Sequence, residues 1–216
     1  MGRIKIIGTS HISPESAKEI EGTIRKEMPD CIAVELDAGR LQGLLRKETI
    51  SLRAVRYIGI RNFFVAKILS MIQGYLGRKT GMMPGEEMLT AVKMAREVRA
   101  DLVLIDQDMQ ITLNRMRAIP FLEKAKIFFS IFKKSEPVEI DLKKVPLEKF
   151  VNKILEEIKN ISPTLYKVLV EERDLHMARA LLELSKRYDN IIAVVGIGHK
   201  RGILRNLGEL KKEQNL

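Results

Sequence analysis

Short apolar runs alternate with longer segments of helical periodicity along the 216-residue chain. The runs are Arg3 to Ile7, Cys31 to Val34, Leu102 to Ile105 and Ile191 to Val195. Near-continuous apolar character over four or five residues is typical of strands that are buried on both faces, as in a parallel sheet. The pattern therefore predicts four core strands.

Helical patterns lie between these runs. The first has Ser13 at its N-cap and Pro14 at its first position, and Pro29 stops it. Further helical patterns cover residues 86–99, 146–160 and 163–188. Strands that alternate with helices predict an α/β fold with a mainly parallel sheet flanked by helices. No repeat, low-complexity tract or linker interrupts the order, so we expect a single domain over residues 1–216.

The composition excludes several classes of protein. Apolar residues make up 45% of the chain and are spread along it, which excludes disorder. Cys31 is the one cysteine, so an internal disulfide or a thiol-rich metal site is excluded. The N-terminal apolar run is too short for a signal peptide, and no stretch reaches the roughly 20 apolar residues that cross a bilayer. We therefore expect a cytoplasmic or membrane-associated protein.

The net charge of +10 is concentrated in two segments. Residues 49–85 contain six Lys or Arg and no acidic residue, and residues 109–134 contain six Lys or Arg and one Glu. Most of the aromatic residues fall in the same segments, at helical spacing. We predict two amphipathic helical inserts, at about 50–80 and 115–134, with apolar stripes and cationic flanks.

Two interpretations of the apolar stripes remain open. The stripes pack on each other or on the core, or they form an exposed surface for a membrane, a second subunit or a hydrophobic peptide. Both hold if the inserts form a lid beside the site. Nucleic-acid binding is not expected, because no recognised reading module is present.

Matching polar motifs follow the first and the last predicted strand. Gly8-Thr9-Ser10-His11 follows the first, and Gly196-Ile197-Gly198-His199 follows the last. The carboxyl ends of parallel strands lie along one edge of a sheet, where ligands bind, so these two histidines predict a shared site. With a carboxylate they suit zinc, manganese or iron(II). Without a metal they would serve as general base and electrostatic stabiliser.

Carboxylates at this edge have competing explanations. Glu35 closes the second strand and is the leading candidate, although pairing with Arg40 or capping a helix explains it as well. Glu86 and Glu87 precede a helix, whose N-terminal dipole alone favours acids. His176 lies in a charged helical run, and we expect it to be structural or exposed. The chain has no phosphate-cradling Gly-Lys-Ser/Thr loop, which argues against phosphate binding of that kind. It also has no Gly-x-Ser-x-Gly elbow, which argues against serine hydrolase chemistry of that kind.

Six ordered motifs occur along the chain. They are Gly8-Thr9-Ser10-His11; Val34-Glu35-Leu36-Asp37 with Arg40; Gly85-Glu86-Glu87-Met88 with Ala91; Leu104-Ile105-Asp106-x-Asp108 with Ile111-Thr112 and Arg115; Glu172-Arg173-Asp174 with Met177-Ala178; and Val195-Gly196-x-Gly198-His199-x-x-Gly202-Ile203. Taken together, these motifs resemble the TraB family, also called the TraB/PrgY or pheromone-shutdown family. The resemblance covers nearly the whole chain, from residue 4 to 203, with one departure, Gln107, where many members have arginine.

The resemblance implies the fold shared by TraB proteins, the TIKI proteases and the more distant erythromycin esterase and ChaN-like proteins, with a site at the sheet edge. TIKI proteins are metal-dependent proteases that act on a secreted signalling peptide. PrgY-type proteins block a small hydrophobic peptide pheromone by sequestration or degradation. Many prokaryotic members continue into a C-terminal hydrophobic membrane region. This chain instead stops at the charged tail KKEQNL, as a soluble-domain piece or a shorter member would.

Matching positions imply the roles of individual residues. Mn, Co or Zn would be held by His11, His199 and Glu87. Glu35 would act as general base on metal-bound water, unless the two glutamates exchange roles. The remaining implied catalytic residues are Arg115, Arg173 and Asp174, and either arginine would hold a substrate carboxylate or an oxyanion.

The function expected from these observations is a metal-dependent hydrolase, most simply a peptidase acting on a small hydrophobic or signalling peptide. The alternative is a non-catalytic module that sequesters a peptide or sits on an anionic membrane surface. A third expectation is a homodimer formed through the apolar stripes.

Overall fold

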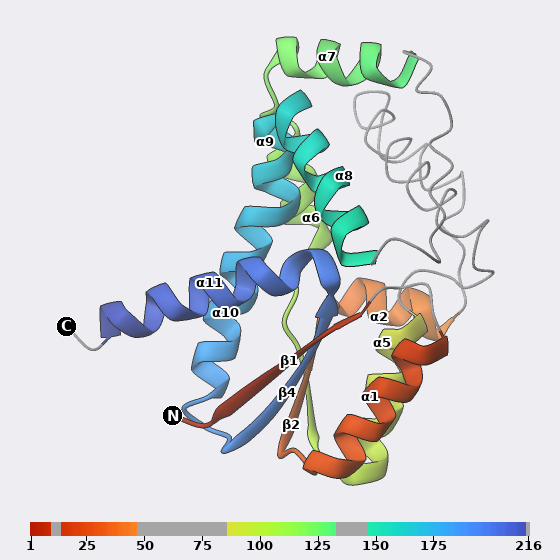
Figure 1. Ribbon diagram of the computed structural model, residues 1–216, viewed down its shortest axis with the longest axis vertical. Helices are drawn as coiled ribbons and strands as arrows, with labels where there is room; N and C mark the ends of the chain where they lie inside the picture. Colours follow the sequence, from red (N-terminus) through yellow and green to blue (C-terminus); the bar gives the residue numbers. More distant parts are fainter. Residues whose placement is uncertain (10–13, 47–85, 133–146, 215–216) are drawn as a thin grey trace.

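The four predicted strands form one parallel sheet in a computed structural model, which describes residues 1–9, 14–46, 86–132 and 147–214 (Figure 1). The strand order is β1-β4-β2-β3, and every pairing is parallel. The strands are β1 (Arg3–Thr9), β2 (Cys31–Val34), β3 (Asp101–Leu104) and β4 (Asn190–Gly196). The predicted α/β class with a mainly parallel sheet is confirmed.

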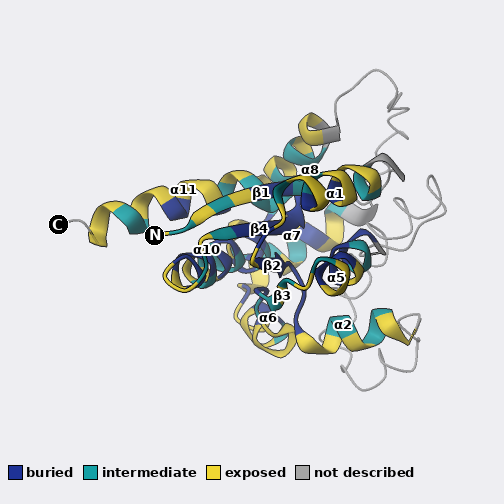
Figure 2. Cartoon of the chain, turned by 90° about the horizontal axis from the view of Figure 1, so that it is seen from below, coloured by how far each residue is buried: buried dark blue, intermediate teal, exposed yellow. Residues whose placement is uncertain are grey.

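Helices cover both faces of this sheet (Figure 2). On one face lie α1 (Pro14–Glu27) and α5 (Glu86–Val98), and on the other lie α10 (Glu172–Leu184) and α11 (Ile197–Gln214). The chain advances from β1 through β2 to β3 and then returns to β4 in the middle of the sheet. Right-handed crossovers that run in opposite directions place their helices on opposite faces, so the return to β4 covers the second face.

Alternation along β4 explains why the predicted strands are almost wholly apolar. Ile191, Ala193 and Val195 pack towards α10 and α11, while Ile192 and Val194 pack towards α1 and α5. Residues two apart in a strand share a face, and here both faces are buried. The sheet therefore separates two apolar cores of comparable size.

A helical arm extends beyond the carboxyl ends of the strands (Figure 1). Its core contains Met116, Ile119, Ile127, Leu165 and Val168. The arm's elements are α6 (Met109–Met116), α7 (Phe121–Phe132), α8 (Leu147–Ile161), α9 (Pro163–Tyr166) and the π-helix η1 (Lys167–Glu171), which continues into α10.

The described residues include only part of the predicted inserts. The insert at about 50–80 lies entirely outside them, whereas residues 121–132 of the insert at 115–134 form α7. In the described parts of the chain, no helix combines the length and apolar character needed to cross a bilayer. The structure also has helices beyond the predicted ranges, namely α2 (Ala38–Leu45), α6 and α11.

Candidate functional site

Glu35 lies at the carboxyl end of β2 and is almost completely buried, with 5% of its surface exposed. Because Ala33 faces α10 and α11, Glu35, two residues later, points to the same side of the sheet. Its Oε2 accepts a hydrogen bond from the Gly196 N–H at 2.6 Å, and its Oε1 accepts one from Arg173 Nη2 at 2.8 Å. The side chain thus joins the ends of β2 and β4 to the start of α10.

Arg173 is the centre of the polar cluster. Its Nε and Nη2 donate to the two oxygens of Asp106, at 2.9 and 2.7 Å, in a bidentate pair. Nη1 donates to the Leu169 carbonyl at 3.2 Å. Asp106 follows β3 and also accepts a hydrogen bond from Arg40 Nη1 at 3.1 Å. One guanidinium therefore binds carboxylates from the ends of two strands.

His199 and Asp174 form a second pair beside this network. Nδ1 of His199 lies 2.6 Å from Asp174 Oδ1. The other ring nitrogen, Nε2, lies 3.2 Å from Arg173 Nη1 and 3.5 Å from Glu35 Oε1. These contacts are satisfied when Nδ1–H donates to Asp174, which leaves the Nε2 lone pair directed at the guanidinium.

The carboxyl groups of Glu35 and Asp174 differ in the direction in which the site shifts their pKa values. Burial alone would raise the pKa of Glu35, but electrostatic interactions with His199, Arg173 and Arg40 and the hydrogen bond from the Gly196 N–H lower it to about 2. Burial raises the pKa of Asp174, and its hydrogen bond to His199 offsets only part of that effect. Glu35 is therefore a fixed anion and a weak proton acceptor. Environments that separate the pKa values of neighbouring acids are typical of functional sites.

The π-helix η1 directly precedes the cluster. The N–H of Glu172 donates to the carbonyl of Lys167, five residues earlier, instead of to the residue four earlier. This wider turn shifts the helical register just before Arg173 and Asp174, and the Leu169 carbonyl receives the Arg173 side chain. Single π turns inside α-helices are frequent at functional sites.

Gly202 permits the close approach between α10 and α11. It lies one turn after His199 on α11, and a Cβ atom at this position would stand 1.8 Å from Asp174 Oδ2. A methyl group would therefore displace the carboxylate from His199 or separate the helices. The spacing His199-x-x-Gly202 thus places the imidazole ring and the position without a side chain, which leaves space for Asp174, on the same face of α11.

We expect Gly202→Ala to lower the free energy of unfolding by about 1–3 kcal/mol, because overpacked sites force side-chain and backbone shifts. Gly208→Ala is the matched control, since it lies on the same helix and a Cβ there would meet nothing within 4 Å. That control should be stabilising by about 0.5–1 kcal/mol, as for glycine removed from a helix interior. Urea denaturation of both variants tests this, and equal stabilities would contradict the assigned clash.

The structure brings together four of the predicted site residues: Glu35, Arg173, Asp174 and His199. Arg115 on α6 is apart from them, with a 64% exposed side chain whose Nε lies 3.7 Å from Glu172 Oε2. His11 lies outside the described residues.

Glu87 is a buried carboxylate on α5, which covers the sheet face opposite α10 and α11. Sequence reasoning did not single out Asp106 as a site residue. Its position directly after an apolar run, like that of Glu35, was the available signal.

The resemblance implies a metal ion, and the described residues do not fit one. Across residues 1–9, 14–46, 86–132 and 147–214, no three His, Cys, Asp or Glu side chains converge as ligands. With Nδ1 bound to Asp174, the ligand atom left on His199 is Nε2, and it faces the Arg173 guanidinium at 3.2 Å. A permanently cationic group in that place repels a metal ion.

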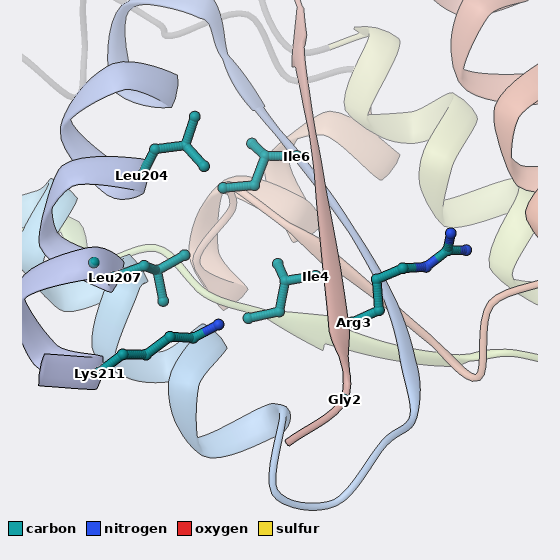
Figure 3. A pocket seen from close by; sticks show the side chains of 8 residues that line it. Gly2, Arg3, Ile4, Ile6, Leu204, Leu207 and Lys211 are labelled. Atoms are coloured by element: carbon teal, nitrogen blue, oxygen red, sulfur yellow. The ribbon is translucent and has the colours of Figure 1, made fainter. Parts of the chain in front are cut away.

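A hollow of about 420 Å³ lies elsewhere, between β1 and α11 (Figure 3). Ile4, Ile6, Leu204 and Leu207 point into it, while Arg3 points to the other side of the strand. Arg3 and Lys5 both bind Glu27 of α1 on that side. The hollow adjoins the amino-terminal half of β1, so it is separate from the polar cluster at the carboxyl ends of the strands.

The fold and the cluster define a class of protein: an α/β sheet whose carboxyl edge carries a buried Glu–Arg–Asp network and an Asp–His pair. The sequence matches the TraB/PrgY/gumN family over residues 2–214, and the chain belongs to this family. The resemblance found in the ordered motifs is confirmed.

The chain is also similar to proteins of distant organisms. The chain is 39% identical over 220 residues to an uncharacterised protein of Methanocaldococcus jannaschii, covering 99% of this chain and 55% of that protein. It is 26% identical over 234 residues to the TraB domain-containing proteins of Mus musculus and Homo sapiens, covering 94% of this chain and 62% of each. The chain thus spans less than two thirds of the length of these relatives.

Proposed function

We propose that the chain is a hydrolase in which His199, oriented by Asp174, is the general base that activates water. The observation that carries this proposal is the 2.6 Å contact between His199 Nδ1 and Asp174 Oδ1. A carboxylate on Nδ1 selects the tautomer whose Nε2 lone pair accepts a proton, and it stabilises the imidazolium that forms. The His199 and Arg173 side chains are 13% and 15% exposed, so water reaches both groups.

In this mechanism a water molecule replaces Arg173 Nη1 as the partner of the Nε2 lone pair and attacks the carbonyl carbon of the substrate, while Nη1 turns to the developing oxyanion. The proton of the water passes to Nε2, and the same proton is delivered to the leaving nitrogen as the carbon–nitrogen bond breaks. Arg173 Nη1 lies 3.2 Å from Nε2 and is the guanidinium nitrogen placed to stabilise the oxyanion. Glu35 and Asp106 hold this guanidinium in position.

The substrate class that we propose is a small hydrophobic or signalling peptide. Membership of the TraB family supports this choice through the resemblance to the TIKI proteases and the PrgY-type proteins. A metal-dependent form of the reaction would need Mn, Co or Zn at His199 with His11 and Glu87. The assay therefore includes added metals, since His11 lies outside the described residues.

Turnover of a mixed peptide library, followed by mass spectrometry, tests the proposal. We expect His199→Ala to lower kcat by about a hundredfold or more, as for loss of a general base. His176→Ala, an exposed histidine on α10, is the matched control and should turn over peptide like the wild type. Each protein is assayed after chelation and again with Mn, Co or Zn.

Equal turnover by the wild type and His199→Ala would overturn the general-base assignment. Circular dichroism verifies that both histidine variants are folded. Peptide that is bound by the wild type without cleavage would support the non-catalytic sequestering alternative instead.

A further inference from the structure

The helix α7 presents an apolar surface that the described residues leave uncovered. Phe121, Leu122 and Phe129 are 82%, 75% and 69% exposed. With about 3.6 residues per turn, these three side chains and Ala125 lie on one side of the helix. We call this side the outer face of α7: Phe121, Leu122, Ala125 and Phe129.

The opposite side of α7 is firmly attached to the arm. Glu123 accepts hydrogen bonds from the Ser162 hydroxyl and from the Thr164 N–H and hydroxyl, the last two at 3.1 and 2.8 Å. Ile127 is buried in the arm's core. These contacts fix the rotation of α7 about its own axis. The helix lies crosswise at one end of the molecule, as its place in Figure 1 shows.

The charges around the outer face have one sign. Lys124 and Lys126 lie at its two margins and are exposed, and Lys133 and Lys134 follow in the sequence. Glu123 is the one acidic residue between Met109 and Lys134 of the sequence, and it is turned inward to Ser162 and Thr164. The outer face is thus an apolar strip bordered by lysines.

We propose that the outer face of α7 docks on an anionic lipid surface, with the helix lying in the plane of the membrane interface. Phenylalanine and leucine enter the boundary between headgroups and acyl chains, while the flanking lysines reach anionic headgroups. A second copy of the chain fits less well, because a pair of such faces would bring lysines against lysines. This proposal is independent of the proposed hydrolase.

The chain lacks tryptophan, so Phe129→Trp introduces a single fluorescent probe on the outer face. We expect its emission to shift to shorter wavelength with vesicles of phosphatidylcholine and phosphatidylglycerol, and much less with phosphatidylcholine alone. Raising the salt from about 0.1 M to about 1 M should weaken binding, since the Debye length falls from about 10 Å to about 3 Å. Leu204→Trp on α11 is the control probe and should not shift.

Paired variants identify the face that binds. Vesicle flotation should show at least about tenfold weaker binding for Leu122→Ser with Phe129→Ser, and for Lys124→Glu with Lys126→Glu. Two control proteins match these variants, and all their substitutions are at exposed positions. The first is Leu204→Ser on α11, and the second combines Lys93→Glu on α5 with Lys212→Glu on α11. They should bind like the wild type.

Three results would overturn the proposal. The first is no preference for anionic vesicles, and the second is an equal loss of binding in the control variants. The third is a dimer in light scattering without vesicles that Leu122→Ser with Phe129→Ser dissociates, since a second copy would then cover the outer face.

Discussion

Replacing Arg173 by methionine should lower the free energy of unfolding by about 3–5 kcal/mol, the range for breaking a buried ion pair from one side. Arg173 binds Glu35 and Asp106, whose side chains are 6% and 2% exposed. Its loss leaves two buried carboxylates without their shared cation. Arg40 remains close to Asp106 at 3.1 Å, so the stranded charge of Glu35 dominates the loss. Chemical denaturation at neutral pH measures the effect.

Arg115→Met is the matched control for this prediction. Its side chain is 64% exposed and its contact with Glu172 is 3.7 Å, so about 1 kcal/mol or less should be lost. The loss of unfolding free energy for Arg173→Lys should fall between those of Arg173→Met and Arg115→Met. Lysine retains the charge but lacks the planar guanidinium that binds Asp106 through two nitrogens. Similar losses for Arg173→Met and Arg115→Met would contradict the central role of Arg173.

Glu35→Gln should lower the free energy of unfolding by about 3 kcal/mol at neutral pH. The pKa of Glu35 falls from 4.5 to about 2 on folding, and each pKa unit corresponds to about 1.4 kcal/mol. Because the folded-state pKa is the lower one, this stabilisation is present above pH 4.5. It is lost as the pH falls from 4.5 towards 2. The stability gap between wild type and variant should therefore narrow in acid.

The difference in free energy of unfolding between the wild type and Glu35→Gln is measured by denaturation at several pH values. These run from neutral pH to the lowest pH at which both proteins are folded. Glu183→Gln supplies the control, since the Glu183 side chain is 65% exposed and pairs with Lys186, three residues later in the turn that follows α10. Its effect should be small at every pH. A gap for Glu35→Gln that stays constant below pH 4.5 would mean that the charge of Glu35 is not what stabilises the fold.

The strands were predictable because their signal is local. Ile191 to Val195 form a continuous apolar run, and such a run has few stable places other than a sheet covered on both faces. The helix α11 was harder to predict, since it begins at Ile197, inside the motif Gly196-Ile197-Gly198-His199, which suggests a turn. Glycines there serve the packing of α11 against its neighbours, and Gly202 shows this most directly through its contact with Asp174.

The site illustrates the limit of sequence reasoning. Glu35 was predicted as a strand-end carboxylate, and the nearby Arg40 was the partner considered for it. In the structure Arg40 binds Asp106, whereas Glu35 binds Arg173, 138 residues further along the chain. Spacing along the chain indicates which side chains lie at the strand ends. It does not indicate which of them meet.

The sequence by itself determined the α/β class, the burial of the two central strands and the family, because these follow from local periodicity and ordered motifs. Only the tertiary structure decided that β4 enters between β1 and β2 and so places Gly196 beside Glu35. It also decided that α10 brings Arg173 and Asp174 to that edge, and that the lysine-bordered face of α7 points outward. The physical reason is that strand order and helix placement depend on contacts between residues far apart in the chain.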